Sequence, residues 1–229
     1  MKEIHRSGIF CAPVVGRILP RRILLTSLGV LLMGAGVSAS VYSGLGTDPC
    51  TCVNLGISRR IGMEFWKWQA VANLIVLIVP LIFSRKRIGF GTVANMFFVG
   101  IVADAMRGTV YRALLPAQPP NLGIRIAFML AGAAILGLGA SFYMVPELGV
   151  APYDSIPLIL AEHLPFEFRW IRVAYDGTAV AAGWLLGSAV GAGTILIACG
   201  LGPMIQFFSG KIRKKFLAQL PGPAGRSVP

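Results

Sequence analysis

A series of apolar segments, each long enough to cross a lipid bilayer, is the feature that most constrains the fold of this chain. About 20 helical residues, rising 1.5 Å each, span the roughly 30 Å hydrocarbon core. Six segments approach this length: Ile23–Ser43, Phe65–Phe83, Ile88–Met106, Ile124–Val145, Phe168–Leu186 and Val190–Phe208. Only 13% of the residues are charged, whereas soluble domains carry about a quarter. These features exclude a soluble globular domain, a disordered chain and a disulfide scaffold, and they predict an all-α polytopic membrane protein.

Two further apolar segments, Pro49–Arg60 and Pro152–His163, are too short to cross a bilayer. Each would reach about 18 Å as a helix, so we expect both to enter the membrane without crossing it. The glycine-rich break Gly44–Pro49 precedes the first of them, and in it Asp48 can cap the helix that the proline begins. Ala151 takes the corresponding place before the second segment and cannot cap it through its side chain.

An internal repeat relates the two halves of the chain. A shift of 103 positions aligns Gly34, Gly36, Ser38, Leu45, Gly46, Pro49 and Leu55 with Gly137, Gly139, Ser141, Leu148, Gly149, Pro152 and Leu158. After one gap the shift becomes 102, which aligns Gly89, Gly91, Thr92 and Gly100 with Gly191, Gly193, Thr194 and Gly202. The conserved order of the matches predicts a duplication. Three spans per half would insert the second copy upside down. We therefore expect six transmembrane helices plus two short re-entrant helices, in two repeated, inverted halves.

The predicted organisation has five parts. These are a cytoplasmic basic tail (1–22), membrane repeat 1 (23–106), a linker (107–122), membrane repeat 2 (123–210) and a second cytoplasmic basic tail (211–229). The net charge of +12 comes from basic residues between apolar runs, which indicates cytoplasmic loops rather than nucleic-acid binding. Six spans place 15 basic residues inside and 6 outside, whereas eight spans give 18 and 3. The charge count thus favours eight spans, while the shortness of the two extra segments favours six.

Several glycine-rich motifs occur in a definite order along residues 23–210. They are Gly44-Leu45-Gly46-Thr47-Asp48-Pro49, Ile88-Gly89-Phe90-Gly91-Thr92-Val93-Ala94-Asn95, Leu148-Gly149-Val150-Ala151-Pro152-Tyr153-Asp154, and Gly183-Trp184-Leu185-Leu186-Gly187 followed by Val190-Gly191-Ala192-Gly193-Thr194. In these motifs the chain resembles the YczE/YitT-like family of bacterial integral membrane proteins. The resemblance implies a bacterial inner-membrane location and five or six spans, but no settled biochemical role. Cys50 departs from the pattern, because a bulkier residue is expected after the proline.

Charged residues inside the predicted spans are the first candidates for a functional site, because each costs about 2.5–3.5 kcal/mol to insert. Arg172 and Asp176 stand four residues apart on one helix face, so they can pair. The pair is either a packing salt bridge or a substrate or proton site in which partners change. Asp154, at the start of the second short helix, either complements the helix dipole or binds a cation or proton.

The first half offers neutral counterparts and one further carboxylate. Asn73 aligns with Asp176, and Asp48 and Thr51 lie at the start of the first short helix. We expect these three residues to add polarity to a substrate path between the halves. The predicted substrate-binding set is therefore Asp154, Arg172, Asp176, Asn73, Asp48 and Thr51.

The sequence carries no HExxH, GxSxG or P-loop motif, and Cys50-Thr51-Cys52 lacks nearby partners for a metal. We therefore expect neither an enzyme nor a metal or other cofactor. The leading hypothesis is a small-solute transporter or channel-like permease of the bacterial inner membrane, with both termini cytoplasmic and a solute of unknown identity. The alternative is a non-transporting membrane partner or regulatory subunit. A homo-oligomer is possible under either hypothesis, and the lipid bilayer is the one partner both require.

Overall fold

The computed structural model describes residues 19–117 and 119–218, and every regular element in these ranges is helical. The helices are α1 (Leu19–Ser43), α2 (Pro49–Arg60), α3 (Phe65–Phe83), the 3-10 turn η1 (Arg85–Arg87), α4 (Phe90–Ala105), the π-helical turn η2 (Met106–Tyr111), α5 (Arg112–Leu114), α6 (Leu122–Met144), α7 (Pro152–His163), α8 (Phe168–Leu185) and α9 (Ala192–Ala218).

Among the described residues, five helical segments are long and apolar enough to cross a membrane. They are α1, α3, Phe90–Leu114, α6 and Ala192–Lys214. The predicted sixth span coincides with α8, whose 18 residues include the charged Arg169, Arg172 and Asp176. With these three charges, α8 is not among the candidate spans.

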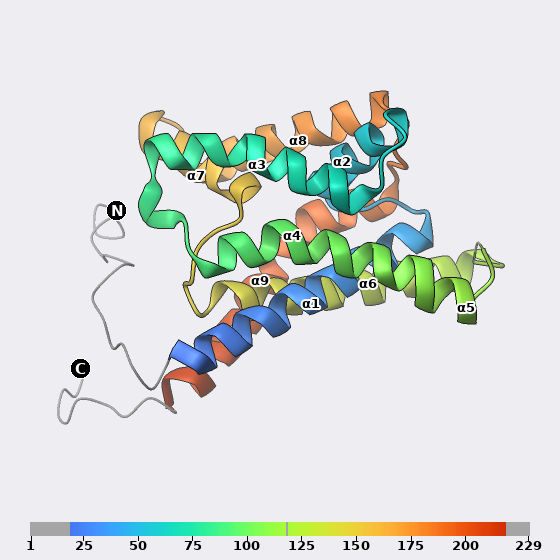
Figure 1. Ribbon diagram of the computed structural model, residues 1–229, viewed down its shortest axis with the longest axis horizontal. Helices are drawn as coiled ribbons and strands as arrows, with labels where there is room; N and C mark the ends of the chain where they lie inside the picture. Colours follow the sequence, from blue (N-terminus) through green and yellow to red (C-terminus); the bar gives the residue numbers. More distant parts are fainter. Residues whose placement is uncertain (1–18, 118, 219–229) are drawn as a thin grey trace.

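The helices lie in two groups. In Figure 1, α2, α3, α7 and α8 lie along the upper part of the molecule, and α1, α4, α6 and α9 lie along the lower part. The most extensive contact joins α1 to α6, and α4 and α9 pack on α1 and α6 respectively. Each short helix packs against a long helix from the other half of the chain, α2 against α8 and α7 against α3.

Glycines allow α1 and α6 to approach each other closely. A Cβ atom at Gly29 would lie 2.5 Å from the Tyr143 nitrogen, and one at Gly36 would lie 2.6 Å from the Leu136 nitrogen. Residue numbers therefore fall along α6 as they rise along α1, so the two helices are antiparallel. Small residues at such an interface let two backbones pack without the spacing that larger side chains impose.

Each glycine break docks on the beginning of a helix from the other half. Gly91 N–H at the start of α4 donates to Leu148 O over 2.8 Å, and Gly193 N–H at the start of α9 donates to Leu45 O over 3.0 Å. The sequence repeat aligns Leu45 with Leu148 and Gly91 with Gly193. The breaks thus make the same contact twice, with the two halves exchanging roles.

The two breaks also share a backbone conformation that favours glycine. Gly46 has φ +115° and its aligned partner Gly149 has φ +120°. A Cβ atom at Gly149 would lie 2.6 Å from Thr92 Oγ1, and one at Gly46 would clash in the same way with Thr194 Oγ1. Backbone strain and lack of space therefore both require glycine at these positions.

Two arginines each join the beginning of one of the helices α1 and α6 to the end of the other. Arg22 Nε donates to the Pro146 carbonyl over 2.8 Å, and Arg125 Nε donates to the Ser43 carbonyl over 2.8 Å. Arg22 aligns with Arg125, and Ser43 with Pro146, at the repeat's shift of 103. Each guanidinium satisfies a carbonyl near the end of the opposing helix, where such groups lack helical partners.

Helical structure extends beyond the predicted boundaries in two places. The predicted linker 107–122 is helical as far as Leu114, because the first proline after α4 is Pro116, which disfavours helix at Leu115. The predicted basic tail 211–229 is helical as far as Ala218, since lysine and arginine are good helix formers and suit a helix C-terminus. The rest of that tail and residues 1–18, with Cys11, lie outside the described residues.

Candidate functional site

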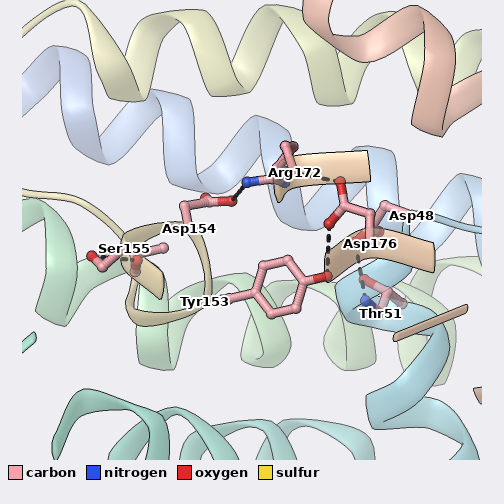
Figure 2. Close-up of polar contacts among 8 residues, drawn as sticks. Asp48, Thr51, Tyr153, Asp154, Ser155, Arg172 and Asp176 are labelled. Carbon is pink, nitrogen blue, oxygen red and sulfur yellow. Dashed lines mark hydrogen bonds and ion pairs between the residues drawn. The ribbon is translucent and has the colours of Figure 1, made fainter. Parts of the chain in front are cut away.

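Arg172 is the centre of a polar cluster within the helical bundle. Its Nε donates to Asp176 Oδ2 over 2.7 Å, and its Nη1 donates to Asp154 Oδ1 over 2.7 Å. Figure 2 shows the guanidinium between the two carboxylates, one from α7 and one from α8. The pairing of Arg172 with Asp176 was predicted from their four-residue spacing, and the structure adds Asp154 to the same guanidinium.

Tyr153 completes the hydrogen bonding of Asp176. Its hydroxyl donates to Asp176 Oδ1 over 2.8 Å, so both oxygens of that carboxylate accept a hydrogen bond (Figure 2). The Tyr153 ring lies 4.7 Å from the Tyr175 ring and 5.6 Å from the Arg172 guanidinium carbon, centroid distances at which aromatic and cation–π contacts operate. The sequence reasoning missed Tyr153, although it stands beside Asp154 in the first turn of a proline-started helix.

The short helix α7 brings Asp154 to the cluster. Pro152 begins the helix with φ already suited to it, and Asp154 follows within the first turn. A carboxylate there complements the free N–H groups and the positive end of the helix dipole. Ala151 gives no side-chain cap, as predicted, and Ser155 Oγ donates to the Ala151 carbonyl instead.

Asp48 caps α2, as the sequence predicts. Its Oδ1 accepts a hydrogen bond of 3.0 Å from the Thr51 N–H (Figure 2). Its Oδ2 accepts one of 3.2 Å from the Thr47 hydroxyl. Thr51 itself is buried. Among the described residues, no arginine or lysine forms an ion pair with Asp48.

Cys50 lies in the first turn of α2, which packs against α8, the helix that carries Arg172 and Asp176. The other short helix, α7, packs against α8 as well. Asp154, Arg172 and Asp176 all come from the second half of the chain, and the first half contributes α2, which begins after Asp48.

Asn73 lies apart from this cluster. Its amide is 6% exposed and Nδ2 donates to the Met96 carbonyl on α4 over 3.5 Å. Gln69, which aligns with Arg172, is equally buried on the same helix. The structure thus joins Asp154, Arg172 and Asp176 through direct contacts, leaves Asp48 in the cap of α2, and places the neutral counterparts between α3 and α4.

The cluster carries more negative than positive charge. One guanidinium faces the carboxylates of Asp154 and Asp176, so the three side chains together carry a formal charge of −1. The side chains of Asp154, Arg172 and Asp176 are 37%, 30% and 16% exposed, so the cluster is only partly buried. A sealed arrangement would bury these charges completely, at a large cost in solvation.

Other charged groups form separate contacts. Asp104 pairs with Arg107 and accepts a hydrogen bond of 2.8 Å from the Trp66 N–H. Glu147 is exposed in the second glycine break. In the described part of the chain, no group of three or more His, Cys, Asp or Glu side chains is placed to hold a metal ion.

Comparison with known proteins gives a consistent set of relatives. A family model described as a family of unknown function, DUF6198, matches residues 20–210. The "Uncharacterized membrane protein YczE" of Bacillus subtilis is 26% identical over 180 residues, 78% of this chain and 81% of its own. An uncharacterized protein of Haemophilus influenzae is 31% identical over 188 residues, 81% of each chain. YyaS of Bacillus subtilis is 25% identical over 196 residues, 84% of this chain and 94% of its own. No solved structure matches.

Proposed function

The chain belongs to the family of unknown function DUF6198 and is a YczE-like membrane protein, and we propose that it is a small-solute transporter or channel-like permease of the bacterial inner membrane. The solute would bind at the cluster formed by Asp154, Arg172 and Asp176, between the two halves of the chain. The polar cluster suits a pathway for one small, charged or zwitterionic solute.

The sharing of Arg172 between carboxylates on two helices is the observation that carries this proposal. A salt bridge that only holds helices together needs one carboxylate per guanidinium. Here the guanidinium has two carboxylate partners and is 30% exposed, so a solute amine can pair with Asp154 while Arg172 keeps Asp176. Ionisable residues within membrane segments mark substrate and ion pathways in many membrane proteins.

We further propose that the halves form an inverted repeat of six spans with α2 and α7 re-entrant. The antiparallel packing of α1 against α6 supports inversion, because these helices occupy matched places in the two halves. In Figure 1, α1 ends and α3 begins at the same end of the molecule, so α2 between them turns back rather than crossing. Binding sites of inverted-repeat transporters lie near the midplane at the repeat interface, where discontinuous helices begin.

Labelling with a membrane-impermeant maleimide tests the topology. Arg59→Cys and Arg169→Cys, each in a background with the native cysteines replaced, place one thiol in the last turn of α2 and one in the first turn of α8. Six spans predict labelling from opposite sides of the membrane, with Arg169 on the cytoplasmic side. Labelling of both thiols from one side would mean that α2 and α7 cross the bilayer, and the proposed site between the halves would be lost.

Uptake into proteoliposomes tests transport. A panel of radiolabelled amines, amino acids, organic acids and inorganic ions is compared between wild type and the triple variant Asp154→Asn, Arg172→Gln and Asp176→Asn. Arg169→Gln is the matched control, because Arg169 is 70% exposed on the same helix and pairs only with Glu167 among the described residues. We expect a solute that wild type and control take up and the triple variant does not.

Two results would count against this proposal. Equal uptake by wild type and the triple variant would remove the cluster as the site. Uptake of no solute by any variant, together with co-purification of one membrane protein in constant stoichiometry, would favour the alternative of a non-transporting partner subunit.

A further inference from the structure

The helix pairs α3–α4 and α8–α9 occupy matched places in the sequence repeat but pack differently. α3 packs along α4, whereas α8 and α9 make at most marginal contact with each other. In Figure 1, α8 and α9 diverge from their connecting turn toward the end where α8 begins, while α3 and α4 converge toward the end where α3 begins. One pair is therefore closed and the other is splayed.

Aligned glycines on α4 and α9 locate the difference. A Cβ atom at Gly100 would lie 3.0 Å from Trp66 Cα and 3.3 Å from Gln69 Oε1. The aligned Gly202 has nothing within 4 Å of the same position. The α3–α4 seam thus uses its glycine for close packing, and the α8–α9 seam carries the same glycine without a neighbour.

The burial of aligned side chains on α3 and α8 follows the same pattern. Phe65 is 4% exposed and its counterpart Phe168 is 44% exposed. Ala70 is 8% exposed and its counterpart Val173 is 60% exposed. The difference therefore extends over the first two turns of both helices and is not confined to one glycine.

From this asymmetry we infer that the structure is one of two gate states, and that the other state closes α8 onto Gly202 while opening α3 away from Gly100. The inference rests on the proposed function, because it describes how a transported solute would be enclosed. Two halves with matched sequences and different conformations can exchange those conformations, which moves the opening from one side of the bundle to the other.

The gate and the polar cluster share the helix α8. Gln69 lies against Gly100 in the closed α3–α4 seam, and Arg172 is the residue aligned with Gln69. Closing the α8–α9 seam therefore brings Arg172 against Gly202 and buries a side chain that is now 30% exposed. A solute held by Arg172, Asp154 and Asp176 would be enclosed by the same movement.

Paired cysteines test the exchange in native membranes, with the four native cysteines replaced. Trp66→Cys with Gly100→Cys reports a closed α3–α4 seam, and Arg169→Cys with Gly202→Cys reports a closed α8–α9 seam. Ser40→Cys with Gly132→Cys joins α1 to α6 as a folding control, since a Cβ atom at Gly132 would lie 2.6 Å from Ser40 Oγ. Copper phenanthroline is the oxidant, and electrophoretic mobility after proteolysis reports each disulfide.

We expect each seam pair to cross-link in chains that carry it alone, and the chain carrying both pairs to form one disulfide or the other. The fraction of chains that carry both disulfides should lie at least fivefold below the product of the two fractions measured when each pair is present alone. If the 169–202 disulfide never forms while the 66–100 and control disulfides do, the splay is permanent and the inference is wrong. Joint formation of both disulfides at the product of their fractions would also overturn it.

Transport is measured separately, so the two proposals can fail independently. If the two disulfides exclude each other in a protein that takes up no solute, the two gate states are supported and the permease proposal is wrong. If solute uptake continues when every chain carries the 66–100 disulfide, transport is supported and the proposed gate is wrong.

Discussion

Gly36→Ala should strongly destabilise the protein, because it inserts a methyl group between α1 and α6 where no space exists. The new Cβ would lie 2.6 Å from Leu136 N, 2.8 Å from Gly132 O and 2.9 Å from Leu136 Cα. All three neighbours are backbone atoms, which cannot move aside as a flexible side chain does. Ordinary van der Waals contact begins at 3.4 Å, so the two backbones must separate by about 0.8 Å.

A gap of 0.5–1 Å forfeits roughly a quarter to a half of the dispersion energy of the atoms beside it. Overpacking a well-packed site costs about 1–3 kcal/mol, and rigid neighbours on α6 place this substitution at the upper end. At roughly 2–4 °C per kcal/mol for a chain of this size, we expect the unfolding midpoint to fall by at least about 5 °C.

The assay is the midpoint of heat-induced loss of the monodisperse peak in detergent, followed by fluorescence-detected size exclusion. Gly200→Ala is the matched control, because nothing lies within 4 Å of its Cβ position. Alanine in an open helical site should leave stability unchanged or raise it by about 0.5–1 kcal/mol. Equal midpoints for Gly36→Ala and Gly200→Ala would refute the close antiparallel packing of α1 on α6.

Further variants test single contacts of the fold and the site. Asp48→Ala removes the α2 cap and should lower the free energy of unfolding by about 1 kcal/mol, measured as a lower unfolding midpoint in detergent. Asp48→Asn keeps a capping oxygen and should retain most of that stability. Arg125→Gln loses the hydrogen bonds to the Ser43 and Gly44 carbonyls. Because the guanidinium is partly exposed, the free energy of unfolding should fall by only about 1 kcal/mol in the same assay. Tyr153→Phe frees one oxygen of Asp176 and should weaken solute affinity in proteoliposomes severalfold with little change in midpoint; an unchanged affinity would exclude the hydroxyl from the site. Gly202→Leu fills the open seam and should abolish uptake with an unchanged midpoint; normal uptake would contradict closure of α8 on α9.

The sequence predicted the short helices closely. The ranges Pro49–Arg60 and Pro152–His163 coincide with α2 and α7, and the Asp48 cap was expected. These features depend on proline, glycine and capping chemistry within a few residues, which sequence carries directly. The continuation of α4 through a π-helical turn was missed because the apolar run that marked this span ends at Met106.

The composition of the site could be predicted only in part. Arg172 and Asp176 share a helix face, so spacing was enough to pair them. The contact from Arg172 to Asp154 joins two helices, and periodicity along one helix does not say which other helix it faces. The same limit explains why Asn73 was wrongly expected in the site. It aligns with Asp176 in the sequence repeat, but its amide lies against Met96 between α3 and α4.

The crossed placement of α2 on α8 and α7 on α3 means that each half of the chain lends its shortest helix to the other. A polypeptide cut between α5 and α6 would then give two fragments, each lacking the piece that covers its own long helix. Such fragments should fold stably only when they are co-expressed. A single half-length ancestor able to insert in both orientations would have met the same requirement by dimerising with itself.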